Sequence, residues 1–380
     1  MHIKRALFPV IESKLFKGKA IIILGARQVG KSTLMNQVTE RLSVQSLHLN
    51  CDDPDVRNLL RDINSVNLKL LIGSNRLIVI DEAQRVENIG LVIKRIVDEN
   101  KDIQVLASGS SSIKLGNSLN EPLTGRKYEY SLFPVSTGEL FETEGLVSTL
   151  QMLESRLIYG SYPEILTHPE EAKELLNHLS DSYLYKDILE MEQIRKPIIL
   201  QKILVALALQ LGSEVSFNEV ANTVGSDPKT VEKYIDLLTK SYVLYPLYGF
   251  SRNLRNELKK TRKIYFYDTG IRNAIIHNFA PLQLRNDVGA LWENFFIMER
   301  IKHNAYSGRY VNYYFWRTKT QQEIDFIEES DGRLALFEMK WNPLKSSAKF
   351  PASFIEEYHP SETHIVTPDN YLDFLLPATK

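Results

Sequence analysis

Eight residues near the N-terminus have the composition and spacing of a phosphate-binding loop. They run from Gly25 to Ser32 and match the pattern G-x-x-x-x-G-K-[ST]. The glycines let the backbone curl so that successive N–H groups point at phosphate oxygens. We expect Lys31 to reach the β- and γ-phosphates and the Ser32 hydroxyl to hold Mg²⁺. The pattern therefore predicts a site for ATP and Mg²⁺.

The elements around this loop are those that the pattern requires. An apolar run at 20–24 predicts a strand before the loop, and the residues from Thr33 to Arg41 have a helical pattern. The helix N-terminus adds partial positive charge next to the phosphates. The expected nucleotide-binding residues of this segment are Gly25, Ala26, Arg27, Gln28, Val29, Gly30, Lys31, Ser32 and Thr33.

A second apolar run, at 77–80, ends in two carboxylates, Asp81 and Glu82. The β-branched run predicts a buried parallel strand, and open α/β sheets bind ligands at the carboxyl ends of such strands. We expect Asp81 to support Mg²⁺ and Glu82 to polarise the attacking water as general base. Lys31 and Glu82 are thus the main catalytic candidates for ATP hydrolysis.

Two further residues are candidates for contact with the γ-phosphate. Ser108 follows a strand-like run at 103–107, although a simple Ser-Gly turn explains it equally well. Arg126 precedes another strand-like segment, at 128–132. We interpret Arg126 as an arginine finger that acts in cis or on a neighbouring chain, with a solvated surface arginine as the alternative.

Composition limits the class of protein. The chain has 380 residues, enough for two or three domains, with ordinary hydrophobic and charged fractions. Its net charge of −1 argues against binding a polyanion by bulk charge, so any nucleic-acid contact must be local. The single cysteine, Cys51, excludes an internal disulfide, and no apolar run approaches about 18 residues. We therefore expect a cytoplasmic protein with no membrane segment.

Changes in pattern along the chain predict an α/β fold followed by smaller parts. Strand and helix patterns alternate up to about residue 134, which indicates a parallel sheet. The expected domains are a P-loop ATPase core over 1–140, which the family resemblance described below makes AAA-type, a helical lid or linker over 141–211, a winged helix-turn-helix over 212–275 and a small α/β domain similar to restriction nucleases over 276–380.

The winged-helix prediction makes DNA a candidate partner. Two short helical patterns flank Gly225, the second begins at Ser226-Asp227-Pro228, and two strand patterns follow. A basic cluster at 252–263 lies where the wing would be, and we expect it to contact phosphates. The second helix mixes lysines with acids that repel phosphate, so a module that binds protein is the alternative.

The last hundred residues contain a second acidic arrangement. Glu338 and Lys340 alternate along one strand pattern and should share a face, while Asp325 lies on the preceding strand pattern. This D…E-x-K order is typical of restriction-type nucleases, in which two carboxylates hold a divalent ion and the lysine orients water. Glu293 could add a further acid and help to hold this second metal. The alternative is an edge strand with solvated charges.

The order of these motifs resembles the prokaryotic family of AAA-type P-loop ATPases with a C-terminal DUF4143 domain. The matching stretches are GARQVGKST (25–33), LIVIDEAQ (77–84), LASGSSS (106–112), LTGRKYEYSLFPVS (123–136), GSYPEIL (160–166), KIYFYDTGIRNAI (263–275), LWENFF (291–296), FWRTKTQQEIDFI (315–327) and LFEMKW (336–341). The resemblance implies an AAA core, a winged helix and a domain similar to PD-(D/E)XK nucleases. It carries metal and catalytic positions to Glu293, Asp325, Glu338 and Lys340.

These observations favour an ATP-binding and ATP-hydrolysing protein, a nucleotide-controlled switch coupled to its C-terminal region. Two alternatives stay open at this point: an ATP-gated, metal-dependent DNA endonuclease, and a scaffold with a degenerate nuclease-like domain. A homo-oligomer or a protein partner is compatible with each of them. Gln84, next to the paired carboxylates, has no assigned role.

Overall fold

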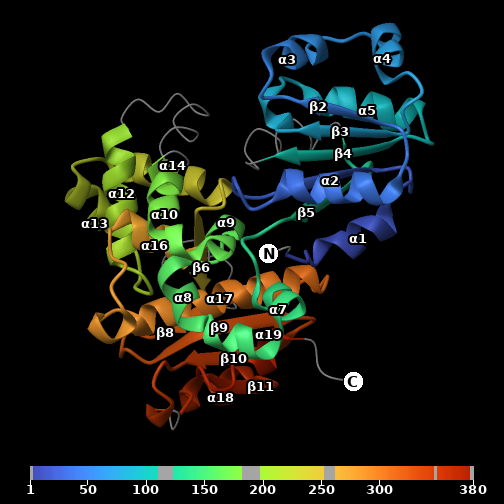
Figure 1. Cartoon of the computed structure of the whole chain (residues 1–380). Coiled ribbons are helices and arrows are strands. Elements are labelled where there is room, and N and C mark those ends of the chain that lie inside the picture. Colours follow the sequence, from blue (N-terminus) through green and yellow to red (C-terminus); the bar gives the residue numbers. More distant parts are fainter. Residues whose placement is uncertain (1–2, 110–122, 182–196, 252–261, 346–348, 377–380) are drawn as a thin grey trace. The chain divides into compact units, whose positions relative to one another are not determined.

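The computed structural model describes residues 3–109, 123–181, 197–251, 262–345 and 349–376 (Figure 1). The chain divides into two compact units. The P-loop unit consists of Ile3–Pro134 with Lys240–Tyr242, and the C-terminal unit consists of Val135–Thr239 and Val243–Lys380. We describe each unit by itself.

The P-loop unit is built on a five-stranded sheet in the order β2-β3-β4-β1-β5, in which all neighbours are parallel. The strands are β1 (Ala20–Leu24), β2 (Ser46–Asn50), β3 (Leu77–Asp81), β4 (Gln104–Gly109) and β5 (Lys127–Ser131). The central strands β1, β3 and β4 are apolar because helices cover both faces of the sheet. This parallel α/β domain confirms the fold expected from the sequence.

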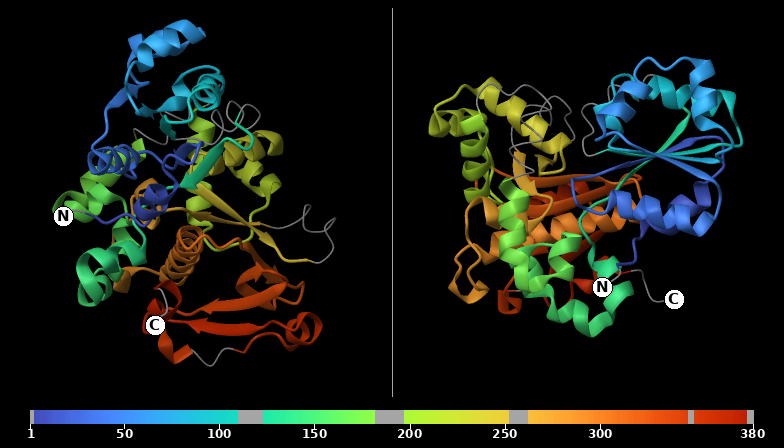
Figure 2. Two further views of the ribbon diagram at one scale, coloured as in Figure 1. Left: turned by 90° about the vertical axis from the view of Figure 1, so that its right-hand side faces the viewer. Right: turned by 45° about the horizontal axis from the view of Figure 1, so that its top comes forward.

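The helices of this unit form two layers around the sheet (Figures 1 and 2). One layer holds α1 (Leu7–Lys14) and α2 (Lys31–Leu42). The other holds α3 (Pro54–Leu60), α4 (Ser65–Ile72) and α5 (Ile89–Glu99), and a 3₁₀ turn, η1 (Ala83–Arg85), follows β3. Buried residues of the second layer pack with Ile22 and Ile80 in one hydrophobic cluster.

The C-terminal unit begins with helices. They are α7 (Thr137–Gln151), α8 (Leu153–Tyr159), α9 (Pro163–Thr167), α10 (Ala172–Asp181), α12 (Pro197–Leu209), α13 (Phe217–Val224) and α14 (Pro228–Lys240), with a 3₁₀ turn η2 (Pro169–Glu171). Gly225 ends α13 in the left-handed conformation, and the Asp227 side chain accepts the Thr230 N–H at 3.0 Å at the start of α14. Both features agree with the helix limits expected from the sequence.

A six-stranded sheet completes this unit, in the order β11-β10-β9-β8-β6-β7. Its strands are β6 (Leu244–Gly249), β7 (Arg262–Phe266), β8 (Asn312–Arg317), β9 (Glu323–Ser330), β10 (Arg333–Met339) and β11 (Glu362–Val366). Its further helices and turns are α16 (Thr269–Ile275), η4 (Leu282–Leu284), α17 (Val288–Tyr306), η5 (Pro343–Lys345), α18 (Ala352–Tyr358) and α19 (Leu372–Leu375). Because β6 pairs with β8, the β6–β7 hairpin belongs to the same sheet as the last four strands. This sheet therefore contains strands from both the predicted winged helix-turn-helix (212–275) and the predicted nuclease-like domain (276–380). The limits of the domains stay a prediction.

Among the described residues, no helix combines the length and the apolar character needed to cross a membrane.

Candidate nucleotide site and a second polar cluster

The P-loop follows β1 directly and leads into α2. Gly30 has a φ of +94°, in the region that favours glycine. A Cβ at Gly25 would lie 2.1 Å from the Leu132 carbonyl oxygen, so only glycine fits there. The Gly25 N–H donates to the Gly109 carbonyl at 3.2 Å, which ties the loop to β4. The loop is therefore fixed on two sides before any ligand binds.

Lys31 is folded onto its own loop. Its ammonium donates to the Gly25 carbonyl at 3.0 Å and to the Ala26 carbonyl at 2.7 Å, and the side chain is almost fully buried. Burial lowers the pKa of Lys31 to about 8, although the negative charges of Glu82 and Asp81 act in the opposite direction. The cation is thus kept close to the position expected for phosphate, with weak neutral partners that an anion can replace.

Asp81 joins the P-loop to the neighbouring strands. The Ser32 hydroxyl donates to one oxygen of Asp81 at 2.5 Å, and the Ser108 hydroxyl donates to the other. Ser108 also accepts the backbone N–H of Glu82 at 3.1 Å. The predicted Mg²⁺ pair therefore lies together, and its hydroxyl and carboxylate oxygens are the ligands that Mg²⁺ prefers. Ser108 contacts Asp81 in this structure.

Glu82 directly follows β3 and has a left-handed backbone conformation, with a φ of +52°. The Gln84 amide donates to one oxygen of the Glu82 carboxylate at 2.5 Å, so the candidate base has a partner within its own segment. A non-glycine residue in this conformation is uncommon and often marks a functional position.

Arg126 lies at the opposite end of the sheet from the P-loop. Its carbonyl accepts the N–H of Ala20, the first residue of β1, whereas the loop follows Leu24, the last residue. Its side chain bonds to Asp98 at 2.5 Å. This placement favours the alternative of a surface arginine over a finger in cis, and the finger in cis stays a prediction. A role on a neighbouring chain stays a prediction.

The acidic residues predicted near the C-terminus also come together. Lys340 lies 2.6 Å from Glu338 and 4.0 Å from Asp325. Burial raises the pKa of Asp325 to about 7, and the negative charge of Glu293 adds to this effect. Burial and the Asp325 charge likewise raise the pKa of Glu338. The strand alternation seen in the sequence thus brings Glu338, Lys340 and Asp325 close together.

Lys263 belongs to this acidic cluster, although we expected it in the basic cluster of the wing, 252–263. Its ammonium lies 3.0 Å from Glu293 and 2.6 Å from Glu323, and its side chain is only 1% exposed. Tyr265 donates to Glu293 as well. The expectation that Lys263 contacts phosphate from the wing is therefore wrong, because carboxylates surround the ammonium inside the fold. Most of the predicted basic cluster, 252–261, lies outside the described residues.

Arg262, the other described residue of that basic cluster, packs against aromatic rings. Its guanidinium lies over the ring of Phe217 at 4.1 Å and near the ring of Tyr248 at 5.8 Å.

Within the described residues, no group of three or more His, Cys, Asp or Glu side chains is arranged to hold a metal ion.

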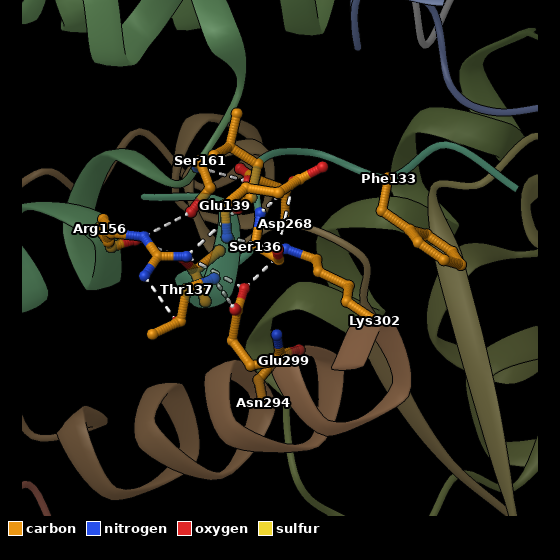
Figure 3. A network of polar contacts seen from close by, with 12 residues as sticks. Phe133, Ser136, Thr137, Glu139, Arg156, Ser161, Asp268, Asn294, Glu299 and Lys302 are labelled. Carbon is orange, nitrogen blue, oxygen red and sulfur yellow. Dashed lines mark hydrogen bonds and ion pairs between the residues drawn. The ribbon is translucent and has the colours of Figure 1, made fainter. Parts of the chain in front are cut away.

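A separate buried polar network lies in the C-terminal unit and includes residues of two of the quoted family-like stretches, 160–166 and 263–275 (Figure 3). Glu299 of α17 contacts Arg156 at 3.1 Å and Lys302 at 2.7 Å, and accepts the Thr137 N–H. Arg156 also donates to Ser161 at 2.9 Å. The Ser161 N–H in turn donates to Asp268 at 2.7 Å. The ionised carboxylate of Glu299 thus connects α17 to α7 and α8 within the C-terminal unit.

Three family models match separate parts of the chain. The model of an AAA domain matches residues 17–141, a domain of unknown function (DUF8612) matches 150–282, and another (DUF4143) matches 288–373. The chain therefore carries an AAA domain with P-loop ATPase character at its N-terminus and a DUF4143 domain at its C-terminus. These matches confirm the AAA and DUF4143 parts of the resemblance.

The relatives lie in bacteria and archaea. An uncharacterized protein of Mycobacterium tuberculosis is 26% identical over 365 residues, which cover 94% of this chain and 78% of the relative. An uncharacterized protein of Methanocaldococcus jannaschii is 25% identical over 339 residues, covering 77% and 71%. A Walker-type ATPase of Pyrococcus abyssi superposes with a TM-score of 0.50 at 15% identity, covering 72% of this chain and 96% of that one. At this identity the similarity concerns the fold alone.

Proposed function

We propose that this chain binds ATP with Mg²⁺ at the P-loop and hydrolyses it, and that the bound nucleotide controls the C-terminal unit as a switch. The observation that best supports this proposal is the grouping of Lys31, Ser32, Asp81 and Glu82 at the carboxyl edge of the parallel sheet. A phosphate, a metal ion and an attacking water can all be served from this edge.

Phosphate binding begins with an exchange of partners at Lys31. The ammonium gives up the Gly25 and Ala26 carbonyls for phosphate oxygens, which carry full negative charge. Since Lys31 is buried, this attraction is screened less than it would be in water. Ser32 and Asp81 would hold Mg²⁺, which would supply the charge neutralisation that phosphoryl transfer needs.

Hydrolysis requires a base for the attacking water. Glu82 takes a proton from the attacking water while the water oxygen forms a bond to the γ-phosphorus. The bond from the γ-phosphorus to the bridging oxygen breaks, and ADP leaves with its electrons. Gln84 restrains the carboxylate from one side through its amide bond. We assign Gln84 this holding role.

Two variants test the proposal. We expect Glu82→Gln to bind ATP but to lose at least about a hundredfold in turnover, the usual scale for a general base. Lys31→Ala should lose ATP binding itself. Glu87→Gln changes an exposed carboxylate of the same segment and should behave like the wild type. Turnover in Glu82→Gln at the wild-type rate would contradict the assigned base.

For the acidic cluster of the C-terminal unit, we propose the scaffold role. The residues, as they are arranged, do not fit a divalent ion, since the ammonium of Lys263 already lies between Glu293 and Glu323 and that of Lys340 contacts Glu338. An internal cation therefore balances these acids. We derive no nuclease step from this cluster.

A cleavage assay tests the scaffold role against the nuclease alternative. Supercoiled and single-stranded DNA are incubated with the wild type and with Glu338→Ala, with Mg²⁺ or Mn²⁺, in the presence and absence of ATP. We expect no cleavage by either protein. Cleavage by the wild type that Glu338→Ala abolishes would contradict the scaffold role. Stimulation of ATP turnover by the same DNA would support the predicted DNA contact.

A further inference from the structure

Arg5 connects the P-loop to a distant part of its unit. The side chain lies just before α1 and is 8% exposed. One nitrogen of its guanidinium donates to the Val29 carbonyl at 2.6 Å, and another donates to the Phe133 carbonyl at 2.6 Å. A single charged group therefore holds the P-loop and the segment after β5 in one arrangement.

The bond to Val29 also fixes the next N–H group. The Val29 carbonyl and the Gly30 N–H belong to the same peptide, which is trans. In a trans peptide these two groups point in opposite directions. Because Arg5 holds the oxygen, the Gly30 N–H is directed away from Arg5. Gly30 lies in the middle of the phosphate-binding pattern, where backbone N–H groups are the anion donors.

We propose that Arg5 is a positioning residue of the ATP site, which rests on the ATP binding proposed above. Arg5 acts through the Val29–Gly30 peptide: it keeps the Gly30 N–H directed at the phosphates and adds positive charge behind the loop. The planar guanidinium has donors for both carbonyls at once. An ammonium is a point charge without this fork, so lysine is an incomplete replacement.

The test compares ligands with and without phosphates. ATP, ADP and adenosine are titrated against the wild type, Arg5→Met, Arg5→Lys and Arg95→Met, and each protein is first checked for cooperative melting. Arg95 is the matched control because it donates to the Ile63 carbonyl at 2.6 Å in the same unit, outside the loop. For Arg5→Met we expect ATP and ADP binding to weaken about tenfold or more, the scale of losing one charge-assisted hydrogen bond. Adenosine binding should not change, and Arg5→Lys should lie between.

Each outcome decides the proposal. Equal binding of ATP by wild type and folded Arg5→Met would overturn it, and so would an equal loss for ATP and adenosine, because general damage does not select for phosphates. If Arg5→Met does not fold, Arg5→Lys is judged by the same criterion. A wild type that binds no ATP would overturn the proposed function itself, whereas normal wild-type binding with unchanged variants would overturn the role of Arg5 alone.

Discussion

Replacing Glu299 with glutamine is the sharpest test of what holds the C-terminal unit together. Glu299 is 2% exposed, and its carboxylate balances the buried cations of Arg156 and Lys302 (Figure 3). Glutamine has the same shape but no charge. The substitution therefore leaves two buried positive charges without their shared anion, one of the few changes that are severely destabilising in a protein core.

The structure gives the size of this effect. Burial alone would raise the pKa of Glu299, but Lys302 and Arg156 outweigh it and lower the pKa from 4.5 to about 2. Since one pKa unit corresponds to about 1.4 kcal/mol, the ionised carboxylate contributes about 3 kcal/mol to the free energy of unfolding. Removing one partner of a buried ion pair typically costs about 3–5 kcal/mol. We expect a loss in this range at neutral pH.

The dependence on pH has a definite sign. The pKa of Glu299 is lower in the folded state than in the unfolded state, so its contribution is complete above pH 4.5 and is lost as the pH falls from 4.5 towards about 2. The difference in stability between wild type and Glu299→Gln should therefore stay constant from neutral pH down to about pH 5 and narrow below it.

Urea unfolding followed by tryptophan fluorescence measures this difference. The three tryptophans, Trp292, Trp316 and Trp341, all lie in the C-terminal unit, so the signal reports that unit. Glu174→Gln changes a carboxylate whose side chain is 76% exposed and should shift the free energy of unfolding by less than about 0.5 kcal/mol. A loss below about 1 kcal/mol for Glu299→Gln, or one that does not narrow at low pH, would refute the reasoning.

Three further predictions follow from single positions. Burial, with nearby carboxylates, raises the pKa of Cys51 to about 12, so the thiol should resist iodoacetamide at pH 8 in the native protein and react in urea; fast native labelling would contradict its burial. Gly160→Ala would bring a Cβ to 1.9 Å from Asp268, so it should lower the melting temperature more than Gly145→Ala, because Gly145 has a similar φ but open space around it. Equal losses in the two variants would contradict a steric clash with Asp268, because backbone strain alone would then explain both. Lys263→Met should destabilise the C-terminal unit, and Mg²⁺ or Mn²⁺ should raise its melting temperature but not that of the wild type; no response to either ion would contradict an internal cation that takes the place of a metal.

The sequence predicts the P-loop well because its chemistry is local. The glycines, Lys31 and Ser32 are neighbours in the chain, and their pattern alone fixes the turn, the donors and the helix start. Asp81 and Glu82 are found for a related reason, since a buried strand predicts where its carboxyl end must lie. The strand β2 was missed because its residues Ser46–Asn50 are mostly half-buried or exposed and show no apolar run.

Positions that depend on tertiary contacts could not be predicted. Arg5 bonds to residues 24 and 128 positions away, and no motif marks it. Lys263 looked like part of a basic wing because the neighbouring residues are basic. Its burial depends on Glu293, 30 residues later, and on strand pairings that bring Glu323 to it. Arg126 could not be assigned to one role because an arginine finger is defined by its position in space, which no local pattern supplies.

A single-turnover measurement of ATP hydrolysis tests the central claim most directly. ATP and Mg²⁺ are mixed with an excess of wild type, of Glu82→Gln and of Lys31→Ala, all purified in the same way, and the formation of ADP is followed by chromatography. The account predicts that the wild type converts bound ATP, that Glu82→Gln holds ATP without converting it, and that Lys31→Ala holds none. Equal conversion by all three proteins would contradict it, since the activity would then not come from this site.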